Sequence, residues 1–216
     1  MPRHVQAAKT TFQLVLIKPT HYDDDGYPIT WLQSHIPSNT LAALYGLGED
    51  CRRRQVLGPD IDIVIKPLDE TNIRIRPDRI VADIRRSGGK ALICLVGVQS
   101  NQFPRAVDLA RQFLKAGLPV ALGGFHVSGC LSMLPVIPAE IQQAMDMGVS
   151  IFGGEAEEGR LGLSGTKPCK DATCPDKINR LKPCDVINSI QTSSRPLPKP
   201  VAESCKKEPN IRRPPH

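Results

Sequence analysis

The chain up to residue 161 alternates between short apolar runs and segments whose apolar residues recur at helical spacing. Apolar runs of about four to eight residues are typical of buried strands, and an apolar residue at every third or fourth position is typical of helices. The apolar runs are residues 12–17, 61–65, 91–98, 119–122 and 149–152. Strands that alternate with helices in this way predict an α/β domain with a parallel sheet and right-handed crossovers.

Proline and glycine residues mark where the intervening helices begin and end. Helix starts are expected near Ser38, Pro77, Pro104 and Pro138. Helix ends are expected at Gly88-Gly89, Gly117 and Gly148, because glycine adopts the left-handed conformation that closes many helices. In the helix after Pro104, the spacing predicts an inner face made by Val107, Ala110 and Leu114.

The most hydrophobic run, residues 91–98, is expected at the centre of the sheet, because a strand covered on both faces loses its polar alternation. Pro67 is expected to end the second strand. These features predict a doubly wound, flavodoxin-like α/β fold whose five-stranded parallel sheet has the order 2-1-3-4-5. The segment 18–39 after the first strand is long for a compact domain, and loops of that size usually carry function.

Composition changes abruptly after about residue 162. Residues 165–216 contain nine prolines, four cysteines and no Phe, Trp or Tyr, so they offer little apolar surface to offset the entropy of ordering. The predicted organisation is therefore an extension over 1–11, an α/β domain over 12–161 and a disordered tail over 162–216. The shift also fits an altered reading frame that replaces a C-terminal domain.

The net charge of +6 belongs entirely to that tail. Residues 1–164 hold 17 Lys+Arg and 17 Asp+Glu, whereas residues 165–216 hold 11 and 5. A nucleic-acid site needs basic residues on a folded face, usually with aromatic residues among them, and the tail has no aromatic residue. We expect no specific nucleic-acid partner.

Seven cysteines and no apparent secretory leader argue against a disulfide framework. The longest apolar stretch is too short to cross a bilayer. These observations predict a cytoplasmic protein without a membrane partner. The chain also lacks the CxxxCxxC cysteine triplet that holds a radical-type iron–sulfur cluster, and the cysteine spacing in the tail is a poor match to a zinc site.

Polar and glycine-rich residues follow four of the predicted strands, and in a parallel sheet these segments meet at one edge. Glycine there allows a ligand to approach the backbone, while amide and hydroxyl groups can bind a large polar ligand. The candidate ligand-binding residues are His21, Tyr22, Gln99, Ser100, Asn101, Gly123, Gly124, Phe125, His126, Gly154 and Glu155.

Taken singly, most of these residues have an ordinary structural explanation. His21 suits a solvated loop, Ser100 suits a helix cap, and Glu155 suits the first turn of a helix. The shared position at one edge of the sheet is what indicates a binding site.

The segments HYDDDGY, GVQSNQFPRA, GGFHVSG and GGEAEEGR carry a family resemblance. With them, residues 12–161 resemble the N-terminal cobalamin-binding domain of cobalamin-dependent radical S-adenosylmethionine proteins. The resemblance implies a corrin ring over the carboxyl ends of the strands. It further implies a nucleotide tail that passes Ser100 and Gly123-Gly124, with Phe125 and His126 along its channel and Glu155 near its far end.

The loop after the first strand departs from the cobalt-binding pattern of the methionine-synthase type, DxHxxG. The aligned residues are Pro19-Thr20-His21-Tyr22-Asp23-Asp24, so His21 is the candidate metal ligand but its Asp and Gly companions are missing. A His ligand depends on the group that orients it. We therefore expect that His21 does not coordinate the cobalt.

Three functions remain open from the sequence. The first is a cobalamin-binding module with no catalytic domain of its own, for which a radical S-adenosylmethionine domain would act in trans. The second is a flavin or nucleotide module, although Asp23, Asp24 and Asp25 would repel a phosphate at the first loop. The third is a nonfunctional truncated product.

Overall fold

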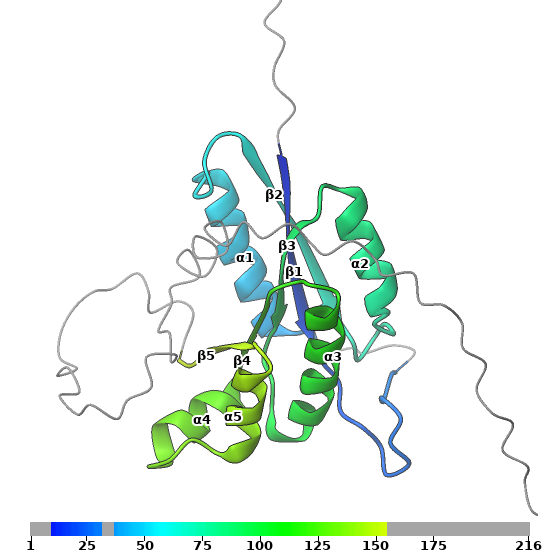
Figure 1. Ribbon diagram of the computed structural model, residues 1–216, viewed down its shortest axis with the longest axis vertical. Helices are drawn as coiled ribbons and strands as arrows, with labels where there is room; N and C mark the ends of the chain where they lie inside the picture. Colours follow the sequence, from blue (N-terminus) through cyan, green and yellow to red (C-terminus); the bar gives the residue numbers. More distant parts are fainter. Residues whose placement is uncertain (1–9, 32–36, 155–216) are drawn as a thin grey trace, which may run out of the picture.

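The computed structural model of the chain describes residues 10–31 and 37–154 (Figure 1). Glu155 and the predicted tail over 162–216 lie outside the described residues. The strands are β1 (Thr10–Lys18), β2 (Ile61–Asp69), β3 (Lys90–Leu95), β4 (Val120–Gly123) and β5 (Ser150–Phe152). The helices are α1 (Asn39–Arg53), α2 (Pro77–Arg86), α3 (Phe103–Lys115), α4 (Phe125–Met133) and α5 (Ala139–Asp146), and a short 3-10 helix covers Ser100–Gln102.

The five strands form one parallel sheet with the order β2-β1-β3-β4-β5, as the sequence predicts. Nine successive residues of β1 pair with β2, and six pair with β3. β3 lies at the centre, and Ile93 and Leu95 on it have no solvent exposure. Because every strand runs the same way, all the loops that follow strands leave from one edge of the sheet, called here the carboxyl edge.

Each face of the sheet has its own apolar core. α1 packs Leu41 and Cys51 against Phe12, Leu14 and Leu16 of β1 on one face. On the opposite face α2, α3, α4 and α5 pack against the alternate residues of the strands, with a fully buried Phe113 at the centre of α3. Figure 1 shows α1 on one side of the sheet and α2 and α3 on the other. This two-sided cover explains why the central strands read as continuous apolar runs.

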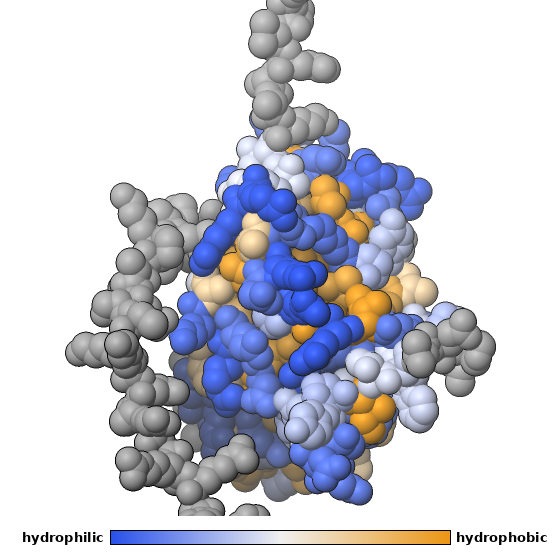
Figure 2. Space-filling model, turned by 90° about the vertical axis from the view of Figure 1, so that its right-hand side faces the viewer, coloured by the Kyte–Doolittle hydropathy of each residue, from blue (hydrophilic) through white to orange (hydrophobic). Residues whose placement is uncertain are grey.

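The surface over the α2 and α3 side is largely hydrophilic, with separate apolar spots between polar side chains (Figure 2). None of the described helices has the length and apolar character needed to cross a membrane.

Three predictions about local structure are wrong in detail, and two strand boundaries are shifted. β2 continues through Pro67 to Asp69, because β2 is an edge strand and an edge strand tolerates a residue without an N–H. The inner face of α3 consists of Phe103, Ala106, Leu109, Ala110 and Phe113, which leaves Val107 and Leu114 only partly buried. Ala110 belongs to both the predicted and the observed inner face, whereas Val107 and Leu114 pack against the core from beside it.

The third error concerns the segment after β4. The sequence predicts a glycine-rich loop there, whereas α4 begins at Phe125, directly after Gly124. The sequence of α4 lacks the amphipathic spacing that predicts a helix. Only Val127 in α4 is buried, and its other residues are partly or fully exposed.

Two strand boundaries also differ from the prediction. β1 begins at Thr10, two residues before the predicted strand, and β3 ends at Leu95, before the predicted end at Val98.

Gly124 joins β4 to α4 at a point where no side chain fits. Its φ is 146°, and a Cβ added there would lie 2.1 Å from the backbone nitrogen of Val98. Both the positive φ and the steric overlap oppose any other residue.

We predict that Gly124→Ala lowers the free energy of unfolding by at least about 2 kcal/mol, the sum of backbone strain and displaced packing. Gly129→Ala is the matched control: Gly129 lies within α4, and a Cβ there meets nothing within 4 Å. Since alanine favours a helix over glycine by roughly 1 kcal/mol, this control should be neutral or stabilising. Urea unfolding of both variants measures the difference, and equal stabilities would contradict the packing described.

Candidate functional site

The carboxyl edge brings together most of the residues that the sequence singles out. Gln99, Ser100 and Asn101 follow β3 and are exposed, and Gly123 and Gly124 end β4. His126 stands in the first turn of α4, and Gly154 follows β5. His21 and Tyr22 lie in the loop after β1 and are partly exposed.

The loops after β3 and β4 are held together by backbone contacts. The Val98 amide donates to the Gly123 carbonyl at 3.2 Å, and the His126 amide donates to the Val98 carbonyl at 3.1 Å. Gly124 lies between them against Val98. The paired glycines therefore serve this backbone packing, and the space directly between the two loops is filled by protein atoms.

This packing brings Ser100 and His126 into contact. The hydroxyl of Ser100 lies 3.0 Å from Nδ1 of His126, and Nε2 of the same ring lies 2.9 Å from Oε1 of Glu140 in the first turn of α5. The ring of Phe103 packs against the imidazole with 4.6 Å between centroids. The imidazole side chain is only 11% exposed, so its orientation is set by the elements around it.

The contact with Glu140 is close but not aligned as a hydrogen bond. Nε2 of His126 is buried and has no hydrogen-bond partner of correct geometry among the described residues. The Glu140 side chain is 55% exposed and can rotate toward the ring nitrogen. A buried polar nitrogen without a hydrogen bond is unusual in a folded protein and marks this position as a candidate for a functional contact.

Two further candidates, Phe125 and Gly154, lie on α4 or next to it. The side chain of Phe125 is 78% exposed, so it points away from the polar contacts. The Gly154 amide donates to the Ser128 hydroxyl on α4 at 3.1 Å, which ties the end of β5 to α4. The candidate residue Glu155 follows immediately but is outside the described residues.

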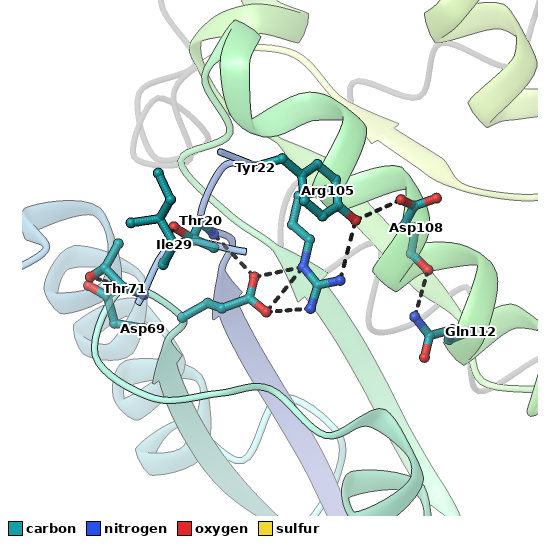
Figure 3. A network of polar contacts seen from close by, with 9 residues as sticks. Thr20, Tyr22, Ile29, Asp69, Thr71, Arg105, Asp108 and Gln112 are labelled. Atoms are coloured by element: carbon teal, nitrogen blue, oxygen red, sulfur yellow. Dashed lines mark hydrogen bonds and ion pairs between the residues drawn. The ribbon is translucent and has the colours of Figure 1, made fainter. Parts of the chain in front are cut away.

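The loop after β1 is anchored by a buried ion pair that the sequence does not reveal (Figure 3). Glu70, which is 1% exposed, accepts hydrogen bonds from the guanidinium of Arg105 on α3, the shortest at 2.6 Å. The same carboxylate accepts the Thr20 amide at 3.2 Å. One buried carboxylate thus joins the end of β2, the start of α3 and the loop after β1.

Tyr22 extends this ion pair to the surface of α3. Its hydroxyl donates to Asp108 at 2.7 Å, a contact drawn in Figure 3. Its ring centroid lies 5.7 Å from the Arg105 guanidinium carbon. Burial raises the pKa of the Tyr22 phenol above its usual value; Arg105 works against this shift and Asp108 adds to it. Tyr22 is therefore a neutral hydrogen-bond donor at physiological pH, and its role in the structure is to fix the loop against α3.

His21 is beside Tyr22, and its carbonyl accepts the Ile29 amide across the loop. The described residues contain no group of three or more His, Cys, Asp or Glu side chains placed to hold a metal ion.

A cavity of about 330 Å³ opens between α3 and α5, next to Phe103 and Glu140. Its walls are mixed and include the apolar side chains of Pro104, Val107 and Met147 and the charged side chains of Asp108 and Arg111. Arg111 and Asp108 pair with each other at 2.6 Å.

Sequence reasoning missed the polar partners on the helices. Glu70, Arg105, Asp108 and Glu140 are charged residues in segments that read as ordinary helix starts or turns. The one available signal for Glu70 was its place directly after a strand, at the same edge as the candidate loops. The positions of Arg105 and Glu140 in the sequence do not indicate their partners. Each contacts a residue of another element, Glu70 after β2 and His126 on α4 respectively.

Comparisons with protein-family models, with curated proteins and with solved structures found no match to this chain.

We predict that Glu70→Gln lowers the free energy of unfolding by about 3 kcal/mol, because it leaves the largely buried Arg105 without its countercharge. The matched control is Arg86→Gln, which breaks the pair with Asp83 at a site where the arginine is 78% exposed; we expect a change of no more than about 1 kcal/mol. Both values come from chemical denaturation. Similar losses in the two variants would show that the Glu70–Arg105 pair does not anchor the loop.

Proposed function

We propose that this domain binds cobalamin at the carboxyl edge of its sheet. The proposal depends chiefly on one observation, the parallel sheet that gathers the segments following β1, β3, β4 and β5 at a single edge. Open α/β sheets bind their ligands at this edge. The residues in these loops are also those that resemble the cobalamin-binding domain of radical S-adenosylmethionine proteins.

The chemistry of the exposed groups fits a large ligand rich in amide groups. Ser100, Gln99 and Asn101 are exposed at the start of the 3-10 helix. Hydroxyl and amide groups can both donate and accept, which suits the carboxamide side chains of a corrin.

The contact between Gly124 and Val98 limits where such a ligand can lie. Because a single methyl group cannot enter there, no part of a ligand fits between the ends of β3 and β4 while the contact holds. The proposal therefore places cobalamin outside that contact, against Ser100 and Asn101, with the loop of His21 and Tyr22 at the border. The cavity between α3 and α5 is a separate opening.

Bound cobalamin would supply a cobalt centre that can carry a methyl group. The residues of this chain would bind and orient the cofactor, while the ion pair of Glu70 and Arg105 would keep the bordering loop in place. A radical S-adenosylmethionine domain acting in trans is the partner that the resemblance implies. The domain would thus be a cofactor-binding module whose chemistry needs that partner.

We predict that the full chain retains hydroxocobalamin on ultrafiltration at micromolar concentrations and changes its visible spectrum. Asn101→Trp should weaken retention by about tenfold or more, because a large ring would block the edge. Asp60→Trp places the same ring on an exposed residue directly before β2, at the opposite end of the sheet, and should leave retention unchanged. Failure of the wild-type chain to retain the cofactor, or equal retention by both variants, would refute the proposal.

A further prediction concerns the cobalt ligand. His21→Ala should leave the visible spectrum of the bound cofactor unchanged, because the residues that would orient His21 as a ligand are absent and the described residues offer no ligand cluster. Absorbance spectra of the two proteins at saturating hydroxocobalamin make the comparison. A shift of the cobalt-sensitive bands in the variant alone would instead assign His21 as the ligand.

A further inference from the structure

Ser100, His126 and Glu140 form a line of polar groups that belong to three different elements. They come from the 3-10 helix after β3, the first turn of α4 and the first turn of α5. We propose that this line is a nucleophilic site, in which Ser100 is the nucleophile, His126 the general base and Glu140 the positioning residue, and that it hydrolyses small esters.

The distances suit proton transfer from Ser100. Its hydroxyl is 3.0 Å from Nδ1 of His126, within the reach required of a nucleophile and its base. The tautomer with its proton on Nε2 leaves Nδ1 free to accept the serine proton and directs the N–H toward the Glu140 side. Glu140 is 2.9 Å away, and a small rotation of its half-exposed side chain aligns it with that N–H.

The surroundings of His126 hold the ring for this task. Its backbone amide is bonded to the Val98 carbonyl, and its ring packs on Phe103. Ser100, by contrast, is exposed, so a substrate carbonyl can reach its hydroxyl. A fixed base beside an accessible hydroxyl is the arrangement that nucleophilic catalysis needs.

Two backbone donors lie beside the nucleophile. The amides of Ser100 and Asn101 open the 3-10 helix that runs into α3, and within the described part of the chain they donate to no other group. Unpaired N–H groups at the start of a helix stabilise negative charge. They are therefore the candidate donors for the oxyanion that forms when Ser100 attacks a carbonyl.

The accessibility of Ser100 indicates the class of substrate. The cavity between α3 and α5 lies on the Glu140 side of the imidazole, and neither Ser100 nor His126 lines it. Because Ser100 is exposed, its hydroxyl is open to small uncharged esters that approach from solvent.

The reaction has two steps. In the first, Oγ of Ser100 bonds to the ester carbonyl carbon while Nδ1 of His126 takes the hydroxyl proton. The bond from that carbon to the leaving oxygen then breaks, and His126 returns the proton to the leaving alcohol. In the second step, water attacks the acyl-serine with His126 again as base, and the products are a carboxylic acid and free Ser100.

The first test uses the full wild-type chain and needs no variant. The protein is incubated with a fluorophosphonate, which phosphonylates activated serines, and the modified peptide is identified by mass spectrometry. The proposal expects phosphonylation at Ser100. Absence of label at Ser100 after prolonged incubation, with a serine hydrolase labelled in parallel, would overturn it.

The second test measures turnover of p-nitrophenyl acetate. Ser100→Ala and His126→Gln should each lower kcat by about 100-fold or more, and Ser132→Ala, an exposed serine on α4, should not change it. Glu140→Gln should lower kcat more than it changes KM, because Glu140 acts through the imidazole of His126. Equal rates for wild type and Ser100→Ala would show that the Ser100–His126 contact is only structural.

This activity does not depend on cobalamin, and both tests are run without the cofactor. Loss of cobalamin retention would leave the labelling of Ser100 unaffected. Conversely, absence of label at Ser100 would not affect the amount of cobalamin that the chain retains.

Discussion

The carboxyl edge of this domain depends on one backbone contact, in which Gly124 packs directly against Val98. With no side chain at Gly124, the ends of β3 and β4 approach closely enough for the Val98 amide to reach the Gly123 carbonyl and for the His126 amide to reach Val98. That approach sets the start of α4 and so brings His126 to Ser100. From the sequence alone this glycine pair indicates a ligand channel, but in the structure it allows the ends of β3 and β4 to pack together.

The loop after β1 is fixed from the other side by electrostatics. Charged groups in the interior are stable only when paired, and the Glu70 carboxylate is satisfied by both Arg105 and the Thr20 amide. The same arginine supports Tyr22, which then reaches Asp108. The carboxyl edge is therefore held by backbone packing between β3 and β4 and by the Glu70–Arg105 ion pair beside β1. A preorganised binding surface requires such fixed supports.

The sequence predicts the architecture well because strand and helix periods differ and because prolines and glycines mark the boundaries. It predicts the sheet order and the sharing of one edge by the candidate loops, and both are confirmed. It fails at Pro67, where position at the sheet edge overrides the usual effect of proline, and at α4, whose residues show no amphipathic pattern. Among the residues in contact at the carboxyl edge, the sequence singles out Ser100 and His126 as candidates. It does not indicate Glu70, Arg105 or Glu140, because contacts between elements distant in sequence leave no local pattern.

The most direct measurement of the central claim is a crystal structure of the full chain grown with hydroxocobalamin. The account predicts the corrin at the carboxyl edge, in contact with Ser100 or Asn101, while Gly124 remains packed on Val98. Cobalamin bound at another surface, or a ligand inserted between the separated ends of β3 and β4, would contradict it.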